Sequence, residues 1–407
     1  MNRVTPFDES DDPFVGLRKV VYEFGYHKFT KILNASMSLA FCCLMLISLH
    51  YLIENFNKDL VIRYSPAFIV STYVSKKYLL HCIFRVQFQL QMMTSMFISM
   101  VLEKRAHYLV SEQKRLFWSI NSAGPSARLL ILKKASQINR FIYLIYAISA
   151  AWGIVMLPVF GSHKEWVMVE YVFDRYFGSS SNILYHITYS CAPFFIYTSV
   201  RHCASLFYII LQLYLQMFLI NQHILEICDD KTVLEKLTFE QRVRHENETF
   251  KKLCFCIDHH VVITRLTKEL VEMVRSVMAF FLLLGVLSCI SALYFMSYVY
   301  ADASNILKVR LCFAVMFNVL VVATFSHAGQ ILIDESGRNF DTLAKCSWYN
   351  WNKRNKTVLH IFMTNCLKPF AITFAGIVLD YKMAIAMFRT ACSYALVFYN
   401  FQKAARS

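Results

Sequence analysis

Apolar runs long enough to cross a lipid bilayer recur along the whole chain. A helix needs about 20 predominantly apolar residues to span the hydrocarbon core, because each residue advances the helix by only about 1.5 Å. Seven segments meet this requirement: residues 32–53, 65–84, 140–158, 183–209, 272–297, 306–327 and 368–398. Helices pair their own backbone polar groups, as the membrane interior demands. The pattern predicts an integral membrane protein with seven transmembrane helices.

The composition favours an all-α membrane fold. Hydrophobic residues make up 57% of the 407 residues and charged residues only 17%, whereas soluble domains average about 45–50% and about 25%. The 10 Gly and 7 Pro residues are few for the many turns of an all-β fold. The net charge of +15 is scattered rather than gathered in one basic block. It therefore indicates contact with membrane lipid and not with nucleic acid.

One further apolar segment is ambiguous. Residues 86–102 could form an eighth span, but three of them are glutamine, which is costly in hydrocarbon. We therefore interpret this segment as a cytosolic extension of the second helix. Residues 210–227 and 250–271 are likewise expected to continue their helices beyond the bilayer. These extensions together predict a helical domain on the cytosolic side.

The distribution of Lys and Arg favours a cytosolic N-terminus, since they are more numerous in the segments that this orientation places inside. The chain then divides into a cytosolic N-terminus, six spans with their cytosolic extensions, a cytosolic segment, the last helix and an extracellular C-terminus. The boundaries are 1–31, 32–327, 328–367, 368–398 and 399–407. The N-x-S/T sequons at Asn34, Asn247 and Asn355 are not lumenal in this topology, so none is expected to carry a glycan.

The cysteines do not resemble a disulfide framework. Many of the 13 lie inside apolar runs, such as Cys42, Cys191 and Cys289, and the segments placed on the extracellular side contain none. Cysteines in such positions are usually small packing residues. We expect them to be reduced.

Other short motifs do not support catalysis, metal binding or coupling to a G protein. The Cys and His residues within 254–260 have C-x-C and adjacent-His spacing, which places them on different faces of a helix instead of in paired zinc-ligand positions. The DRY tripeptide at 174–176 lies well past the third span instead of at its inner end. No Gly-rich phosphate loop, G-x-S-x-G or H-E-x-x-H sequence occurs. We predict no enzymatic activity, no cofactor and no metal site.

The last third of the chain carries several short motifs in a fixed order. They are the G-x-x-L-x-x-E-S pattern from Gly329 to Ser336, Trp348-Tyr349, Lys368-Pro369, Gly376, Phe388 and Ser393-Tyr394. In this order and spacing the stretch resembles the insect odorant receptor family. Ala395 departs from the family pattern, in which a second Ser often occurs. Elsewhere the chain is similar to the family in length and span layout.

The resemblance implies a ligand-gated cation channel with inverted topology relative to G-protein-coupled receptors. Family members form heteromeric, four-subunit, non-selective channels with a common co-receptor in the plasma membrane of olfactory sensory neurons. The tuning subunit binds the odorant, the segment 328–367 would belong to the cytosolic anchor, and the last helix would line the pore. Aligned on the family motif, Val397 and Asn400 would form the gate together with Tyr394. Hydrophobic constrictions close pores by dewetting.

The resemblance also implies an odorant pocket in the outer half of the bundle, between the second and sixth helices. A small hydrophobic volatile suits a closed, aromatic-lined cavity with few polar groups. The candidate residues are Phe68, Ser71, Thr72, Tyr73, Ser149, Trp152, Gly153, Met156, Tyr185, His186, Tyr189, Ser288, Ser291, Tyr294 and Phe295. Trp152 and Tyr189 are the favoured odorant contacts, because the small neighbours Gly153 and Ser190 leave room beside them. His186 or a serine is suited to donate a hydrogen bond to an ester or carbonyl.

Other protein classes, both related and unrelated to odorant receptors, remain as alternative interpretations of the sequence. An insect gustatory receptor has the same layout, and its end motif is partly matched by Ser393-Tyr394 and Asn400-Phe401. A G-protein-coupled receptor requires the opposite orientation, and a transporter predicts internal repeats or broken helices that we do not find. The co-receptor itself is expected to carry a large cytosolic insert, for which residues 220–271 leave no room.

Overall fold

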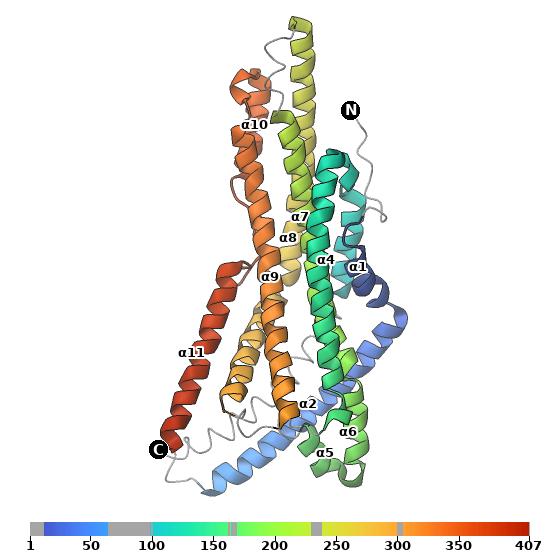
Figure 1. Cartoon of the computed structure of the whole chain (residues 1–407), viewed down its shortest axis with the longest axis vertical. Coiled ribbons are helices and arrows are strands. Elements are labelled where there is room, and N and C mark those ends of the chain that lie inside the picture. The colour runs from blue at the N-terminus through green and yellow to red at the C-terminus, as the bar shows by residue number, and fades with distance from the viewer. Residues whose placement is uncertain are drawn as a thin grey trace.

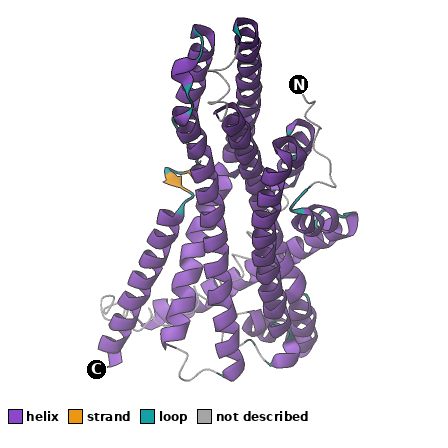
Figure 2. Cartoon of the chain, turned by 45° about the horizontal axis from the view of Figure 1, so that its top comes forward, coloured by secondary structure: helices purple, strands orange, loops and turns teal. Residues whose placement is uncertain are grey.

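Long helices make up most of the computed structural model, which describes residues 12–63, 98, 101–161, 163, 169–228, 238–298 and 304–406 (Figures 1 and 2). The long helices are α2 (Lys28–Arg63), α4 (Gly124–Val155), α7 (Ala192–Cys228), α8 (Phe239–Tyr298), α9 (Asn305–Lys345) and α11 (Tyr381–Arg406). The shorter elements are α1 (Val15–Arg18), a π-helix (Lys19–Phe24), α5 (Val169–Phe177), α6 (Ser181–Ser190), α10 (Lys353–Cys366), β1 (Thr373–Phe374) and β2 (Ile377–Val378). Short 3₁₀ turns cover Ile120–Ala123, Pro158–Phe160, Gly178–Ser180 and Trp348–Asn350. The predicted all-α class is confirmed.

Among the described residues, four helical stretches are long and apolar enough to cross a membrane. They are Lys28–Ser48, Gly124–Val155, Val172–Cys228 and Asn305–Lys345. A fifth arises if Phe239–Arg275 and Val277–Ile290, which meet at 51° within α8, count as one span. These stretches contain or overlap the predicted first, third, fourth, fifth and sixth spans. The predicted second span, 65–84, and most of the ambiguous segment 86–102 lie outside the described residues, although residues 101–116 are helical.

The helices run between two ends of an elongated bundle. We call the end that holds α10 and the start of α8 the anchor end, and the end that holds α5 and α6 the outer end (Figure 1). The predicted helical extensions are present, since residues 210–227 continue α7 and residues 250–271 belong to α8. Helix propagation costs little once a nucleus exists, so long apolar helices readily continue past a span.

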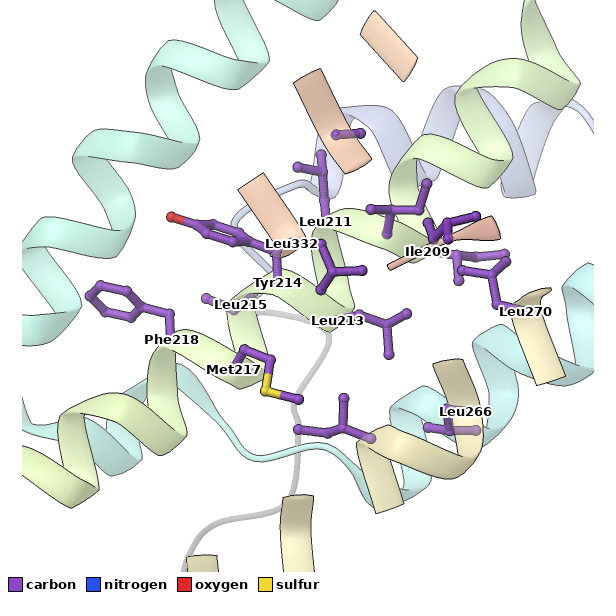
Figure 3. Close-up of a cluster of buried hydrophobic side chains, with 14 of the residues drawn as sticks. Ile209, Leu211, Leu213, Tyr214, Leu215, Met217, Phe218, Leu266, Leu270 and Leu332 are labelled. Atoms are coloured by element: carbon purple, nitrogen blue, oxygen red, sulfur yellow. The ribbon is translucent and has the colours of Figure 1, made fainter. Parts of the chain in front are cut away.

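Helix α7 is the centre of the bundle and packs against α4, α8 and α9. Every residue from 205 to 221 is buried, and a helix that is apolar on all sides needs neighbours on all sides. Figure 3 shows side chains projecting from α7 on several sides, with Leu266 and Leu270 of α8 and Leu332 of α9 in the same buried cluster. These buried residues of α7 therefore form the core that links the anchor end to the rest of the bundle.

Side-chain caps fix where several helices begin. The Ser304 hydroxyl accepts a hydrogen bond from the Leu307 N–H at 3.3 Å, at the start of α9. The Asp380 carboxylate accepts one from the Met383 N–H at 2.8 Å, at the start of α11. Such caps satisfy N–H groups that the first helical turn leaves without a backbone partner.

The last helix begins later than the sequence suggested. We expected residues 368–398 to be helical, but α11 starts at Tyr381, and a β1–β2 hairpin precedes it. Pro369 cannot donate a helical hydrogen bond. Ala375 and Gly376 have positive φ angles of 48° and 78°, which an α-helix does not accommodate. The apolar residues before Tyr381 therefore form a compact linker instead of a helix.

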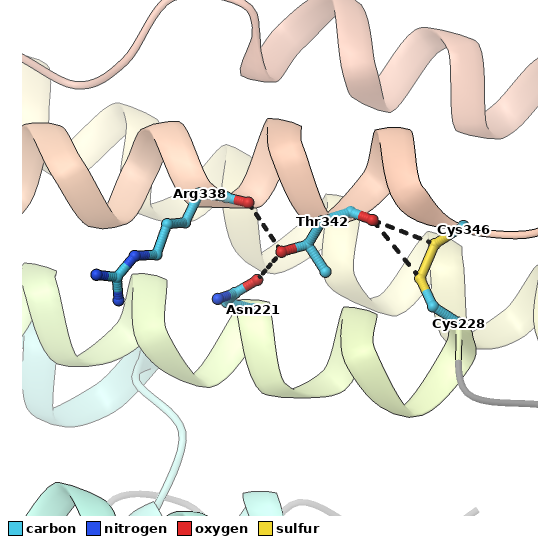
Figure 4. Close-up of a disulfide and its surroundings, with 5 residues drawn as sticks. All are labelled: Asn221, Cys228, Arg338, Thr342 and Cys346. Carbon is cyan, nitrogen blue, oxygen red and sulfur yellow. Dashed lines mark hydrogen bonds between the residues drawn. A yellow bond between two sulfur atoms is a disulfide. The ribbon is translucent and has the colours of Figure 1, made fainter.

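Two cysteines depart from the expectation that all are reduced. Cys228, at the end of α7, and Cys346, just after α9, form a disulfide with a Cα–Cα distance of 4.6 Å (Figure 4). Beside it, the Thr342 hydroxyl donates to the Asn221 side-chain oxygen at 2.6 Å, again linking α7 to α9. The sequence could not indicate the pairing because 118 positions separate the two cysteines. The ten other cysteines in the described residues are free.

Candidate functional site

A buried aromatic cluster occupies the outer half of the bundle. It contains four of the predicted ligand residues, Trp152, Met156, Tyr185 and Tyr189, which are between 1% and 7% exposed. Helix α9 contributes Phe317, whose ring lies 5.0 Å from that of Trp152. Residues of α4, α6, α7 and α9 thus meet in one apolar core, as the predicted pocket requires. We call this set the outer cluster.

A polar network covers the outer cluster on the side of the outer end. The His163 Nδ1 atom lies 2.7 Å from the Tyr185 hydroxyl, which donates to the Gly161 carbonyl at 2.9 Å. The His163 ring stacks on Tyr189 at 3.9 Å. Arg310 of α9 donates to the same Gly161 carbonyl at 3.1 Å. The loop after α4 is thereby tied to α6 and α9.

His163 and Arg310 were not among the predicted site residues. Each stands alone in the sequence, without a motif, and only the fold brings them together. Burial, followed by the positive charge of Arg310, lowers the pKa of His163 to about 3. The imidazole is therefore neutral at physiological pH, so no second positive charge is buried beside the guanidinium.

The structure shows the surroundings of three other predicted ligand residues. His186 is exposed, whereas Tyr185 and Tyr189 are buried, because residues four apart share a helix face and His186 points elsewhere. Gly153 does not leave room for a ligand, since a Cβ there would lie 2.9 Å from the Cα of Pro193 and α4 packs closely on α7. The Ser149 hydroxyl donates to the Ile145 carbonyl of its own helix at 2.7 Å.

The remaining predicted ligand residues are only partly placed by the structure. Ser288 is half-buried on α8. Ser291, Tyr294 and Phe295 belong to the same helix, but their side chains are outside the described set. Phe68, Ser71, Thr72 and Tyr73 lie outside the described residues altogether.

The motif that begins at Gly329 holds the linker before α11 against α9. A Cβ at Gly329 would collide with the Leu379 carbonyl, so only glycine permits this approach. Ser336 lies seven residues after Gly329 on α9, and its hydroxyl accepts a hydrogen bond from the Phe370 N–H at 2.9 Å. The first and last residues of the motif therefore each fix one end of the linker.

A third contact reaches α11 itself. The His327 Nδ1 atom lies 2.7 Å from the hydroxyl oxygen of Tyr381, the first residue of α11. The two rings are nearly parallel, with an interplanar angle of 21°. Since α9 also carries Phe317 of the outer cluster, one continuous helix contacts both that cluster and the last helix.

The predicted gate residues lie on the exposed side of α11. Met383, Met387, Ala391 and Ala395 are buried, and α11 contacts α8 and α9. Spacing of four residues marks this as the face that packs on the bundle. The predicted gate residues Tyr394, Val397 and Asn400 are all exposed, which leaves them free of the bundle within one chain.

The Cys and His residues considered as zinc ligands serve packing. His259 stacks on Trp118 at 3.9 Å and its Nε2 lies 2.9 Å from the Gln216 side-chain oxygen. His260 stacks on Phe370, with ring centroids 5.2 Å apart. Within the ranges that the structure describes, no three His, Cys, Asp or Glu side chains gather as a metal site would need.

Helices long and apolar enough to span a membrane, packed around a buried aromatic cluster, are typical of a multi-span helical membrane protein. The profile of the family described as 7tm odorant receptor matches residues 61–392, and the chain belongs to this family. The predicted family is thereby confirmed.

The fold is similar to solved structures of the insect olfactory receptor OR5 from Machilis hrabei. One is 13% identical, with a TM-score of 0.65, and the match covers 92% of this chain and 90% of that one. A second, of the same receptor in complex with eugenol, is 15% identical, with a TM-score of 0.58, and the match covers 95% and 99%. The search of curated proteins gives no match.

Proposed function

We propose that this chain is the odorant-binding, or tuning, subunit of a heteromeric odorant-gated cation channel. It would assemble with the odorant co-receptor into a tetramer in the plasma membrane of olfactory sensory neurons, with a cytosolic N-terminus. Membership of the odorant receptor family supports reception. The observation that carries the channel mechanism is the continuity of α9, which contacts the outer cluster through Phe317 and α11 through His327.

The outer cluster supports the binding of a small hydrophobic volatile. Trp152, Met156, Tyr185 and Tyr189 supply apolar and aromatic surface shielded from solvent. Burial of apolar ligand area contributes on the order of 25 cal/mol per Å², and the loss of ligand freedom offsets part of this gain. We therefore expect micromolar affinity, with selectivity set mainly by shape.

Gating would follow from a shift of α9. A ligand opens the channel only if it binds the open state more tightly than the closed state. A ligand that displaces Phe317 would act on α9, and the contacts of His327 and Gly329 would pass the shift to α11. Within a tetramer, the exposed side of α11 would face the pore, with Val397 as the apolar constriction and Asn400 as a polar lining next to Tyr394.

Heterologous expression tests this proposal. Cells would carry this chain alone, the insect co-receptor alone, or both, and cation current would be recorded during exposure to an odorant panel. We expect odorant-evoked current that requires this chain and is absent without the partner. A response that depends on G-protein signalling, with no channel current under any of these conditions, would overturn the proposal.

A further inference from the structure

A charged groove lies between α4 and α9, nearer to the anchor end than the outer cluster. Its volume is about 230 Å³, and α7 contributes Tyr214 to its lining. The lining residues of α4 fall within 134–138 and those of α9 within 327–338. The predicted third span begins at Arg140 and the predicted sixth span ends at His327. The groove therefore begins at the edge of the hydrocarbon core, where lipid headgroups lie.

The groove carries both signs of charge. Lys134 and Arg338 supply two positive charges, and Asp334 and Glu335 supply two negative charges. The net charge is therefore zero, whereas strongly anionic lipids bind clusters of about four to eight basic residues. A groove with both signs of charge and no net charge suits a zwitterionic ligand.

The two basic side chains are oriented by the fold and can still bind a ligand. The Lys134 ammonium donates to the Tyr214 hydroxyl at 3.1 Å and lies 4.8 Å from the centre of the Phe218 ring. An ammonium has three donors, so it can bind a second partner at the same time. The Arg338 guanidinium donates to the Glu335 carboxylate at 3.1 Å, but its side chain is 56% exposed. Its fork of five donors can also bind two oxygens of a phosphate.

Asp334 supplies an acceptor for the positive end of a zwitterion. Its side chain is exposed on α9, and one carboxylate oxygen accepts a hydrogen bond from the Gln330 side chain at 2.8 Å. A carboxylate has about four acceptor positions, so it can also accept a hydrogen bond from a primary ammonium group. A quaternary ammonium has no N–H to donate. The groove therefore favours an ethanolamine headgroup over a choline headgroup.

The helix faces that line the groove become apolar towards the outer end. Leu144 lies seven residues after Gln137 on α4, and Leu320 lies seven residues before His327 on α9. Seven residues make almost two helical turns, so each leucine shares a face with the groove residue of its own helix. Leu144 is 52% exposed and Leu320 is half-buried. Acyl chains can pack along these faces while the headgroup occupies the groove.

The dimensions of the groove fit such a headgroup. One water needs about 10–15 Å³ of volume measured in this way, so the groove holds the equivalent of about fifteen waters or more. A phosphoethanolamine group of about eight non-hydrogen atoms fits into this space. Charge, hydrogen-bonding capacity, size and the adjoining apolar faces thus agree on an amphiphilic zwitterion.

We propose that the charged groove binds a glycerophospholipid with an ethanolamine headgroup. Its phosphate lies between Lys134 and Arg338, and its ammonium donates to Asp334. His327 also lines the groove, and its Nδ1 atom lies 2.7 Å from the Tyr381 hydroxyl. The bound lipid therefore contacts the residue that joins α9 to α11. The proposal requires a chain that spans a membrane, but it does not depend on a tuning role or on the outer cluster.

Native mass spectrometry of the full-length chain in a neutral detergent tests the headgroup. The samples receive phosphatidylethanolamine, phosphatidylcholine or phosphatidylglycerol with identical acyl chains. We expect phosphatidylethanolamine to bind about 3- to 10-fold more tightly than either of the other two lipids. Asp334→Asn should remove this preference, because the neutral amide no longer attracts the ammonium.

The basic residues are tested with a matched pair on α4. Lys134→Met removes the charge and keeps a long side chain, and we expect it to weaken phosphatidylethanolamine binding by about 3- to 10-fold. Lys133→Met is the control, because Lys133 is exposed and is not among the groove residues. Arg338→Met should act like Lys134→Met from an exposed position of α9. The thermal midpoint of each variant is measured in parallel.

Three outcomes would overturn the proposal. One is equal binding of phosphatidylethanolamine by the wild type, Lys134→Met and Arg338→Met. Another is an equal loss in Lys134→Met and Lys133→Met, which would indicate general attraction to a basic surface. The third is displacement of the lipid by an equal concentration of O-phosphoethanolamine, which would identify a soluble phosphate ester as the occupant. None of these measurements depends on channel current, so the outcome is separate from that of the proposed function.

Discussion

The imidazole of His327 and the phenol of Tyr381 lie 54 positions apart in the sequence and join α9 to α11. Their polar atoms are 2.7 Å apart, and their rings lie nearly parallel. Tyr381 is the first residue of α11, and Asp380 just before it caps that helix. The start of α11 is therefore held to α9 by a side-chain hydrogen bond where the linker ends.

This contact predicts a role for the Tyr381 hydroxyl in gating. Tyr381→Phe keeps the ring and removes the hydrogen bond, which contributes about 0.5–1.5 kcal/mol. We expect the odorant concentration for half-maximal current to shift by about 2- to 10-fold, with little change in surface expression. Tyr108→Phe is the matched control, because Tyr108 is 54% exposed and lies outside the anchor segment. Equal dose–response curves for the wild type and Tyr381→Phe would remove His327 from the mechanism.

The outer cluster predicts that large aromatic side chains set odorant sensitivity. Trp152→Ala and Tyr189→Ala should each reduce the current response at least tenfold, because either change removes a buried ring. Truncation of a buried aromatic also costs about 3–5 kcal/mol of stability, so surface expression must be measured in parallel. His186→Ala, on the exposed side of α6, is the control and should respond normally. If both Trp152→Ala and Tyr189→Ala respond like the wild type, the pocket lies elsewhere.

Two glycines on α9 give a matched pair for the linker contact. A Cβ at Gly329 collides with the Leu379 carbonyl, whereas a Cβ at Gly337 meets only Pro369 Cγ at 3.9 Å. Gly337→Ala should therefore be neutral or stabilise the fold by about 0.5–1 kcal/mol, since alanine favours a helix. Gly329→Ala should lower the thermal midpoint of the purified protein. A higher midpoint for Gly329→Ala would show that α11 does not need this close approach.

His163 predicts a loss of stability at acidic pH. Its pKa falls from 6.5 to about 3 on folding, chiefly through burial and then through Arg310. Below pH 6.5, His163 therefore binds a proton in the unfolded chain but not in the folded protein. The contribution of His163 is fully present above pH 6.5 and declines as the pH falls towards 3. At pH 5 the loss amounts to about 2 kcal/mol at most.

Thermal unfolding at pH 7.5 and pH 5 measures this effect. The decrease in midpoint on acidification should be larger for the wild type than for His163→Gln, which lacks the titrating group. Tyr185 and Glu170 remain beside the loop in both proteins, so their contributions cancel in the comparison. Identical decreases would mean that His163 is protonated without cost and is not enclosed by Tyr189 as the structure shows.

Much of the fold is predictable because the membrane imposes simple rules. Uninterrupted apolar segments must be helical in lipid, and the stretches within α2, α4, α7 and α9 follow directly. Even the extensions of α7 and α8 beyond the predicted spans could be anticipated from their helical continuity. The start of the last helix could not, since Ala375 and Gly376 adopt positive φ angles within an apolar run that hydropathy treats as uniform.

Within the candidate site, the sequence by itself determined the family and a set of aromatic residues. Trp152 and Tyr189 proved to be buried together, because apolar aromatics in spanning helices tend to pack inward. Only the tertiary structure decided that Gly153 packs on Pro193, that His186 faces outward and that His163 meets Arg310. Periodicity and motif spacing describe one helix at a time. Which helix faces meet and where α9 touches α11 depend on contacts between distant segments, which no local pattern encodes.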